Sequence, residues 1–456
     1  MKNATPCAVF GALLFVVLPS IARAAPPPPL YSVINVNPVG SSSVLAYDLN
    51  DDYQVVGYGF AGANERGFLW MPGVPSFAYD TISGDTKYGA YAINALGQIA
   101  GAGYNSTLNN AANATIWDPV GYLSTGYTKA VDLAGTGTFG SAFHGMDQFG
   151  EAVGWLSASN TTANSLLWAS NAASQGVAAY RPYAVNYSYF ASCGYNPTTG
   201  QATWAPSLQS PATPTPLTGG TFGGSTFANY SYAWALDEAN DVVGDCFNST
   251  TAGYQAFAWN GMTGAPYGPL GNLPNTNTSQ ADGIDSVTGQ VVGQSGYHAF
   301  LWQGDITTPS TGTMTDLNSL IENNSGWLLV HAYAINDYGA IVGYGYYQHA
   351  EAAFLAIPVV VSSLTMASPS VVGGNTISGT VTLDAPAPFD MNVTVSSYSS
   401  KVNFGAGVYS TGVVIYSGNT SADFVANTST VTSDTPAVLK ATFGGWRRYA
   451  TIHVLP

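Results

Sequence analysis

The sequence predicts an all-β chain: a seven-bladed β-propeller followed by an immunoglobulin-like β-sandwich. Three observations carry this prediction. A short phrase, apolar-Asn/Asp-turn-apolar-Gly, recurs seven times between Ser43 and Pro358. An apolar triplet ending in Trp follows most copies. Only 8% of the residues are charged, whereas 13% are aromatic, a balance that favours packed strands over disorder.

Residues 1–24 are predicted to be a cleaved secretory signal. Lys2 supplies a positive start, an apolar stretch runs over residues 8–18, and residues 22–24 read Ala-Arg-Ala, a small-x-small cleavage site. The apolar stretch is too short for a membrane span, and no later stretch is long and apolar enough to be one. We therefore expect a secreted or cell-surface protein, with the periplasm as the other destination that fits a signal of this kind. Four prolines at 26–29 then form a stiff spacer.

Residues 25–358 form the repeat region. Each copy is marked by one Asn or Asp that precedes a turn; the seven markers are Asn50, Asn94, Asp147, Asn186, Asp237, Asp285 and Asn336. Asn and Asp bond their own backbone in tight turns, and the β-rich run that follows, such as residues 54–57, completes a hairpin. With the Trp triplet and one further extended segment, each unit has about four short strands, which is typical of a propeller blade. A solenoid is the alternative, but it favours more uniform repeat lengths.

The tryptophans of the triplets occupy a fixed place in the repeat: Trp70, Trp117, Trp168, Trp204, Trp259 and Trp302. They could stack on sugars, but a Trp beside two apolar residues is better explained as core between neighbouring blades. Residues 359–456 follow a different pattern, with roughly seven short alternating segments in about 100 residues, as in a β-sandwich.

The phrase at Ile335–Gly343 and the segment His298-Ala299-Phe300-Leu301-Trp302 resemble the HAF family of bacterial extracellular repeats. The resemblance spans the repeat region and is weakest in the fourth copy. It implies a secreted, propeller-like repeat domain and supplies no catalytic residues. The segment from Val361 to Val454 looks like the bacterial Ig-like domains that follow extracellular modules.

Charge restricts the partners. The whole chain carries a formal charge of −15, and removal of Lys2 and Arg23 with the signal makes the mature chain more acidic still. Nucleic acid and anionic lipid are therefore poor partners, while a glycan or an extracellular protein remains compatible. The oligomeric state is left open by the sequence.

No cofactor is expected, with calcium as the one alternative. Its best candidate ligands are the acids of the fifth copy, Asp237, Glu238, Asp241 and Asp245, because Ca²⁺ takes carboxylate oxygens. The competing and preferred interpretation is that such residues fix their own turns. None of the five histidines forms a metal-spaced pair, and an edge-strand or loop role is expected for His298.

Tyrosines that alternate along expected strands or loop tips are the candidate ligand-binding residues: Tyr187, Tyr189, Tyr230, Tyr232, Tyr344, Tyr346 and Tyr347. Cys193 and Cys246, the only cysteines left after cleavage, form either a disulfide or two buried thiols.

The sequence favours a non-catalytic binding or surface-interaction module whose propeller loops contact a glycan or a protein. No catalytic residue is predicted, because neither a nucleophile elbow nor a phosphate loop is present. A carbohydrate-active enzyme with acids lining the channel is one alternative, since paired carboxylates perform glycoside chemistry. A structural component of a surface layer or matrix is the other.

Overall fold

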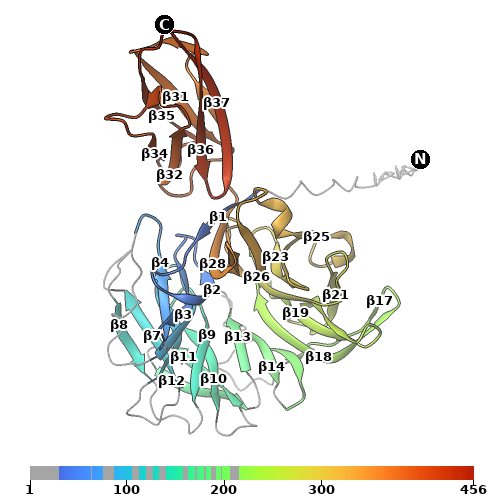
Figure 1. Cartoon of the computed structure of the whole chain (residues 1–456). Helices are drawn as coiled ribbons and strands as arrows, with labels where there is room; N and C mark the ends of the chain where they lie inside the picture. The colour runs from blue at the N-terminus through green and yellow to red at the C-terminus, as the bar shows by residue number, and fades with distance from the viewer. Residues whose placement is uncertain are drawn as a thin grey trace, which may run out of the picture.

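The computed structural model describes residues 30–62, 64–74, 87–104, 112–119, 127–132, 140–157, 163–169, 172–178, 181–185, 192–196, 198–205 and 215–456. These residues form a broad ring of small sheets with a slender two-sheet unit standing on one side of it (Figure 1). The predicted signal and the candidate residues Tyr187 and Tyr189 lie outside the described residues.

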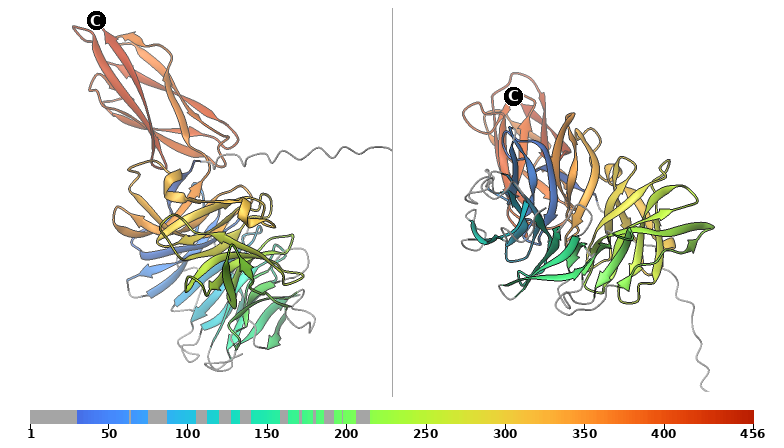
Figure 2. Two further views of the ribbon diagram at one scale, coloured as in Figure 1. Left: turned by 90° about the vertical axis from the view of Figure 1, so that its right-hand side faces the viewer. Right: turned by 90° about the horizontal axis from the view of Figure 1, so that it is seen from below.

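Seven antiparallel sheets lie between Ser32 and Ile357. Their innermost strands are β2 (Ser42–Leu49), β5 (Lys87–Ile93), β9 (Ser141–Met146), β13 (Arg181–Val185), β18 (Ser225–Leu236), β22 (Ser279–Ile284) and β26 (Trp327–Ile335). Each contacts the next, and β26 contacts β2, so the ring is closed. In Figure 2, right, the sheets follow one another around a centre from blue to orange.

Outside each inner strand lie two more strands in hairpin order. The second strands are β3 (Val55–Ala61), β6 (Ile99–Tyr104), β10 (Ala152–Ser157), β14 (Ser192–Asn196), β19 (Asp241–Asn248), β23 (Val291–Ser295) and β27 (Ile341–Tyr347). The third strands are β4 (Asn64–Trp70), β7 (Ala112–Pro119), β11 (Ala163–Ala169), β15 (Gln201–Ala205), β20 (Gly253–Asn260), β24 (His298–Gln303) and β28 (Ala350–Ile357). In the six repeats whose marker is described, the marker turn joins the first strand to the second.

The outermost strands are β8 (Tyr127–Asp132), β12 (Ala172–Ala178), β16 (Thr215–Pro216), β21 (Pro266–Gly271), β25 (Thr313–Asp316) and, in the last sheet, β1 (Ser32–Asn35). A short strand, β17 (Thr221–Phe222), extends the edge of β18, and the two 3-10 turns are η1 (Pro309–Thr311) and η2 (Leu317–Leu320). Because β1 pairs with β28, the start of the chain completes a sheet built from its far end.

The glycine that ends each repeat phrase is explained by a close approach of two strands. A Cβ on Gly343 would lie 1.9 Å from the main-chain oxygen of His331 on the neighbouring inner strand. Gly57 is in the same position, with the oxygen of Leu45 at 2.0 Å. No other residue fits there without moving the backbone.

The tryptophans of the repeat are mainly core, as predicted. Trp117, Trp259 and Trp302 are fully buried and Trp204 nearly so, whereas Trp70 and Trp168 are partly exposed. Each packs with apolar residues of its own and the neighbouring sheet, which is how adjacent sheets of the ring hold together.

The C-terminal unit has two sheets. One is β29 (Val361–Met366), β31 (Thr376–Leu383), β35 (Ser421–Thr428) and β33 (Val402–Asn403); the other is β30 (Ser370–Val372), β37 (Trp446–Leu455), β36 (Thr435–Phe443), β32 (Met391–Ser397) and β34 (Ser410–Ile415). Buried and exposed residues alternate along these strands, and the buried set of both sheets forms one core. Two-sheet packing of this kind follows from period-two patterning.

The C-terminal unit packs on the first and last sheets of the ring. The indole Nε1 of Trp446 donates to the main-chain oxygen of Tyr31 at 2.7 Å, and the amide of Val33 donates to Gly444 at 3.1 Å. The ring of Phe389 lies edge-on against Tyr53, 5.4 Å away between centroids.

The prediction of an all-β, propeller-like chain is confirmed. Among the described residues, no helix has the length and apolarity to cross a membrane.

Candidate functional site

The pairing of each inner strand with the second strand of its sheet shifts register shortly before the marker. Pairing with the second strand skips Tyr47, Tyr91, His144, Tyr183, Trp234, Asp282 and Tyr333. Each is the extra residue of a β-bulge, three positions before its marker. A bulge re-aims the side chain of the extra residue, and here all seven line the same space at the centre of the ring. We call these seven residues the belt.

Neighbouring rings of the belt contact one another around most of the circle. The centroids of Tyr333 and Tyr47 lie 4.9 Å apart, those of Tyr47 and Tyr91 5.6 Å, and those of Tyr91 and His144 4.9 Å. The series continues through Tyr183, 5.4 Å from His144, to Trp234, 4.7 Å further on. Asp282 occupies the remaining place between Trp234 and Tyr333.

The belt lies between two cavities. An outer cavity of about 500 Å³ is lined by the belt together with Tyr58, Glu65, Gln280 and His331. An inner cavity of about 220 Å³ is lined by the same belt and by residues nearer the marker turns, among them Asp48. The outer volume is within the range of sites that hold small ligands, and its walls combine aromatic faces with a few polar groups, as such sites do.

Asp282 is the only carboxylate of the belt, and it is held from two sides. His331 Nε2 lies 2.8 Å from its Oδ2, and Gln280 Nε2 donates to its Oδ1 at 2.7 Å. Asp245 is nearby, buried behind Trp234, whose Nε1 donates to it at 2.7 Å. Burial raises the pKa of Asp245 to about 7, and the charge of Asp282 adds to this, although the indole hydrogen bond opposes it.

Two tyrosine hydroxyls of the belt, those of Tyr47 and Tyr333, stay protonated. Burial raises the pKa of Tyr47 well above its usual range, and its neighbours Tyr58 and Tyr333 add to the effect, in part through a hydrogen bond between the hydroxyls of Tyr47 and Tyr58. Burial raises the pKa of Tyr333 in the same direction, with Asp282 as the next cause. The Tyr333 hydroxyl can therefore donate a hydrogen bond to a ligand at any physiological pH.

The marker residues fix their own turns, as the preferred interpretation predicts. Asn50 Oδ1 accepts from the amides of Asp52 at 3.1 Å and Gln54 at 3.0 Å, and the other described markers repeat this pattern. The side-chain amides of the asparagine markers also bond to the neighbouring sheet. Asn50 Nδ2 donates to the main-chain oxygen of Asn94 at 2.9 Å. Asn94 Nδ2 donates likewise to Asp147 at 3.0 Å. Neighbouring sheets are thus bonded marker to marker.

The four acids predicted as calcium ligands are not brought together. Asp237 accepts from the amides of Ala239 and Asp241 in its own turn. Asp241 accepts from the hydroxyl of Tyr267 at 2.8 Å, Asp245 lies behind Trp234, and Glu238 is exposed at the turn. Within the described residues, no three His, Cys, Asp or Glu side chains are placed to hold a metal ion. Asp241 and Asp245 share a face of β19 but are four residues, or about 13 Å, apart along the strand, and Asp237 and Glu238 belong to the turn before it.

Two of the predicted tyrosines lie beside the belt. Tyr232 stacks on Trp234 with centroids 5.5 Å apart, and Tyr344 stacks on Tyr333 at 6.1 Å. Tyr230 and Tyr346 are exposed, at 60% and 37%, and Tyr347 packs against Trp327. The belt itself was not predicted, although six of the seven residues at this place in the repeat are Tyr, His or Trp, and an alignment on the markers displays them.

Cys193 and Cys246 are both free and buried. The structure therefore contains two buried thiols and not a disulfide between them. They belong to one apolar cluster between the fourth and fifth sheets. Cys246 Sγ donates to the main-chain oxygen of Ala228 at 3.0 Å, and burial raises its pKa to about 12. Neither thiol is therefore suited to act as a nucleophile.

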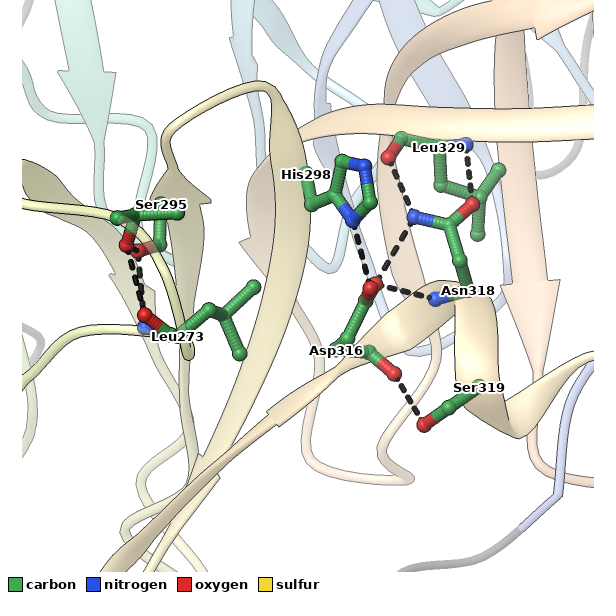
Figure 3. A network of polar contacts seen from close by, with 8 residues as sticks. Leu273, Ser295, His298, Asp316, Asn318, Ser319 and Leu329 are labelled. Carbon is green, nitrogen blue, oxygen red and sulfur yellow. Dashed lines mark hydrogen bonds and ion pairs between the residues drawn. The ribbon is translucent and has the colours of Figure 1, made fainter.

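His298 has a structural role in the sixth sheet. Its Nδ1 lies 2.6 Å from Asp316 Oδ2, and Asn318 joins the same carboxylate to Leu329 on β26 (Figure 3). The network links β24, β25, η2 and β26. The expected edge-strand or loop position is wrong, because β24 lies between β23 and β25.

No family model and no curated protein matches the chain, so the resemblance to HAF repeats has no support from these comparisons. Among solved structures it is similar to a protein described as TolB from Agrobacterium tumefaciens, at 11% identity and a TM-score of 0.36, over 72% of this chain and 96% of that one. It is also similar to an exo-β-1,3-galactanase from Phanerochaete chrysosporium with β-1,3-galactotriose, at 9% identity and a TM-score of 0.24, over 78% and 93%. Likenesses this distant say nothing about function.

Proposed function

We propose that the chain is an exported, non-catalytic binding module that holds a neutral glycan in the outer cavity above the belt. In this proposal the seven sheets are the blades of a seven-bladed propeller, and the C-terminal unit is an Ig-like sandwich that supports the ring on one side. The observation that carries the proposal is the belt, where six aromatic or imidazole rings line one cavity of about 500 Å³.

The chemistry of the walls favours a sugar. Flat aromatic faces pack against the apolar faces of pyranose rings, and the protonated hydroxyl of Tyr333 can act as a hydrogen-bond donor. None of the described residues that line the outer cavity is a lysine or an arginine, so an anionic glycan would lack a counter-charge.

The test is a glycan array followed by calorimetry on the mature chain, residues 25–456, using the neutral oligosaccharides that score on the array. Trp234→Ala and Tyr183→Ala should each weaken binding about tenfold, because each removes one stacking face. Tyr416→Ala, which removes an equally large but exposed ring from the C-terminal unit, is the matched control. Binding that survives both belt substitutions would place the glycan elsewhere and end the proposal.

A carbohydrate-active enzyme is a second candidate, and one observation favours it. Asp245, whose pKa burial raises to about 7, lies close enough to Asp282 to feel its charge, and two nearby carboxyl groups are the working pair of glycosidases. If the protein releases reducing sugar from an oligosaccharide and the Asp282→Asn variant does not, the protein is an enzyme. Tight binding without turnover supports the binding module.

A further inference from the structure

The other end of the channel, where the marker turns lie, has a different character from the belt. The residues that follow six of the seven markers line a cavity of about 550 Å³ at this end, and three of them are the acids Asp51, Glu238 and Asp337. The marker Asp147 is a fourth acid in its wall. We call these four residues the acidic mouth. None of the described residues that line this cavity is basic.

The acids of the mouth repel one another. Burial raises the pKa of Asp51, and the charge of Asp337 raises it further. Burial and then the charges of Asp285 and Glu238 raise the pKa of Asp337. Asp147 is 3% exposed, and its Oδ2 has no hydrogen-bond partner, although its Oδ1 accepts from two amides. A buried carboxylate oxygen without a donor is rare and costly, and it marks the mouth as a place for positive charge.

Apolar side chains stand at several of the marker turns beside the mouth. In four of the described turns the residue two after the marker is large and exposed: Leu96 at 58%, Phe149 at 63%, Val287 at 69% and Tyr338 at 63%. We call these four residues the apolar rim. Tyr338 stacks on Tyr53, which in turn contacts Phe389 of the C-terminal unit, so the rim continues onto a packed surface. Large apolar residues gathered on one face mark an interaction site.

We propose that the acidic mouth and the apolar rim form a docking surface for a partner protein, which inserts an arginine or lysine into the mouth and packs apolar neighbours on the rim. This inference goes beyond glycan binding and does not depend on it. Charge complementarity selects the basic residue, and the rim selects its apolar flanks.

Other occupants use only part of this surface. A bare metal ion needs several ligands at about 2.0–2.6 Å, and no described group of three acids or histidines can supply them. A free polyamine would neutralise the mouth but leave the rim exposed. An anionic membrane would meet the rim but be repelled by the mouth.

The test uses the mature chain and three labelled synthetic peptides, followed by fluorescence anisotropy. The first peptide has two arginines flanked by leucines, the second has serines in place of the leucines, and the third has glutamates in place of the arginines. The first should bind at least about tenfold more tightly than either of the others, since it alone matches both mouth and rim. Its binding should also weaken with added salt.

Protein variants locate the site. Glu238→Gln removes a charge from the mouth and should weaken the first peptide about threefold to fivefold. Glu351→Gln removes the same charge from an exposed site at the opposite end of the last sheet and should change nothing. Phe149→Ser on the rim should weaken the first peptide while leaving the second unchanged.

Three outcomes would overturn the proposal. The first is no binding of the leucine–arginine peptide. The second is equal binding of the serine–arginine peptide, together with equal losses in Glu238→Gln and Glu351→Gln, which would show diffuse attraction to an acidic protein. The third is competition by Ca²⁺ or spermidine at the affinity of the peptide, which would make the mouth a site for small cations.

Discussion

The side-chain amide of Asn336 in the last repeat donates a hydrogen bond of 3.1 Å to the main-chain oxygen of Asn50 in the first repeat. The two residues are 286 positions apart in the chain. The same marker-to-marker bond joins Asn50 to Asn94 and Asn94 to Asp147. Near the channel, the ring is therefore closed by the same kind of hydrogen bond that joins the first three sheets to one another. At its periphery, the ring is closed by the pairing of β1 with β28.

Asn336→Asp should lower the free energy of unfolding by roughly 2–3 kcal/mol. The substitution removes the donor and sets a carboxylate oxygen against the oxygen of Asn50, while the turn itself keeps its acceptor. Urea unfolding measures the change. Asn196→Asp is the control, because the Oδ1 of Asn196 accepts from Thr198 and Thr199 and an aspartate would keep this acceptor. Equal effects of the two substitutions would contradict a role for the amide in closure.

Asp147→Asn should stabilise the protein by about 1 kcal/mol at neutral pH. The substitution removes a buried negative charge that lies near Glu238, and Oδ1 would still accept from the amides of Phe149 and Glu151. Asp285→Asn is the matched control, since both oxygens of Asp285 already accept hydrogen bonds in its own turn. The prediction fails if Asp147→Asn has the lower melting temperature.

Gly343→Ala should destabilise the protein by about 2–3 kcal/mol. The new Cβ would meet the oxygen of His331 at 1.9 Å and the Cα of Ala332 at 2.9 Å, so two strands of the last sheet must separate beside the bulge at Tyr333. Gly253→Ala, where the nearest atom would be 3.1 Å away, should cost much less. Thermal unfolding compares the melting temperatures of the two variants. Similar melting temperatures would argue against the close approach of the strands at Gly343.

Stability should fall as the pH rises from about 4 to about 7. The pKa of Asp245 in the folded protein is raised from 3.8 to about 7, so the folded state binds a proton that the unfolded state has already released in this window. Asp48, whose pKa burial also raises to about 7, acts in the same direction.

Asp245→Asn should make the pH dependence of unfolding shallower without abolishing it, because Asp48 remains. The asparagine oxygen can still accept from Trp234, so the fold around the belt is kept. Urea unfolding at about pH 5 and about pH 8 gives the slope. Asp423→Asn, an exposed change in the C-terminal unit, is the control. If the free energy of unfolding of Asp245→Asn changes with pH as steeply as that of the unsubstituted protein, the Asp245 carboxyl does not cause the pH dependence.

The local chemistry of the turns could be predicted from the sequence. An Asn or Asp before a Gly-rich turn has one favourable use for its oxygen, and Asn50 and Asp147 use it in that way. The apolar triplets ending in Trp were predicted as core because burial explains an aromatic residue at a fixed place beside two apolar ones better than sugar stacking does, and Trp117 and Trp302 are fully buried.

The site depended on relations that no single repeat contains. The belt arises because a bulge in each inner strand turns Tyr183 or Asp282 out of its sheet, and a bulge is a feature of pairing between strands. Asp237, Asp241 and Asp245 are close in sequence, but each has its own hydrogen-bond partner and they form no cluster. Asp51 and Glu238 are distant in sequence and line one cavity. The sequence by itself therefore determined the repeated unit and its turns, since these depend on neighbours along the chain. Only the closed ring decided which side chains meet at the channel, because those contacts join residues from all the sheets at once.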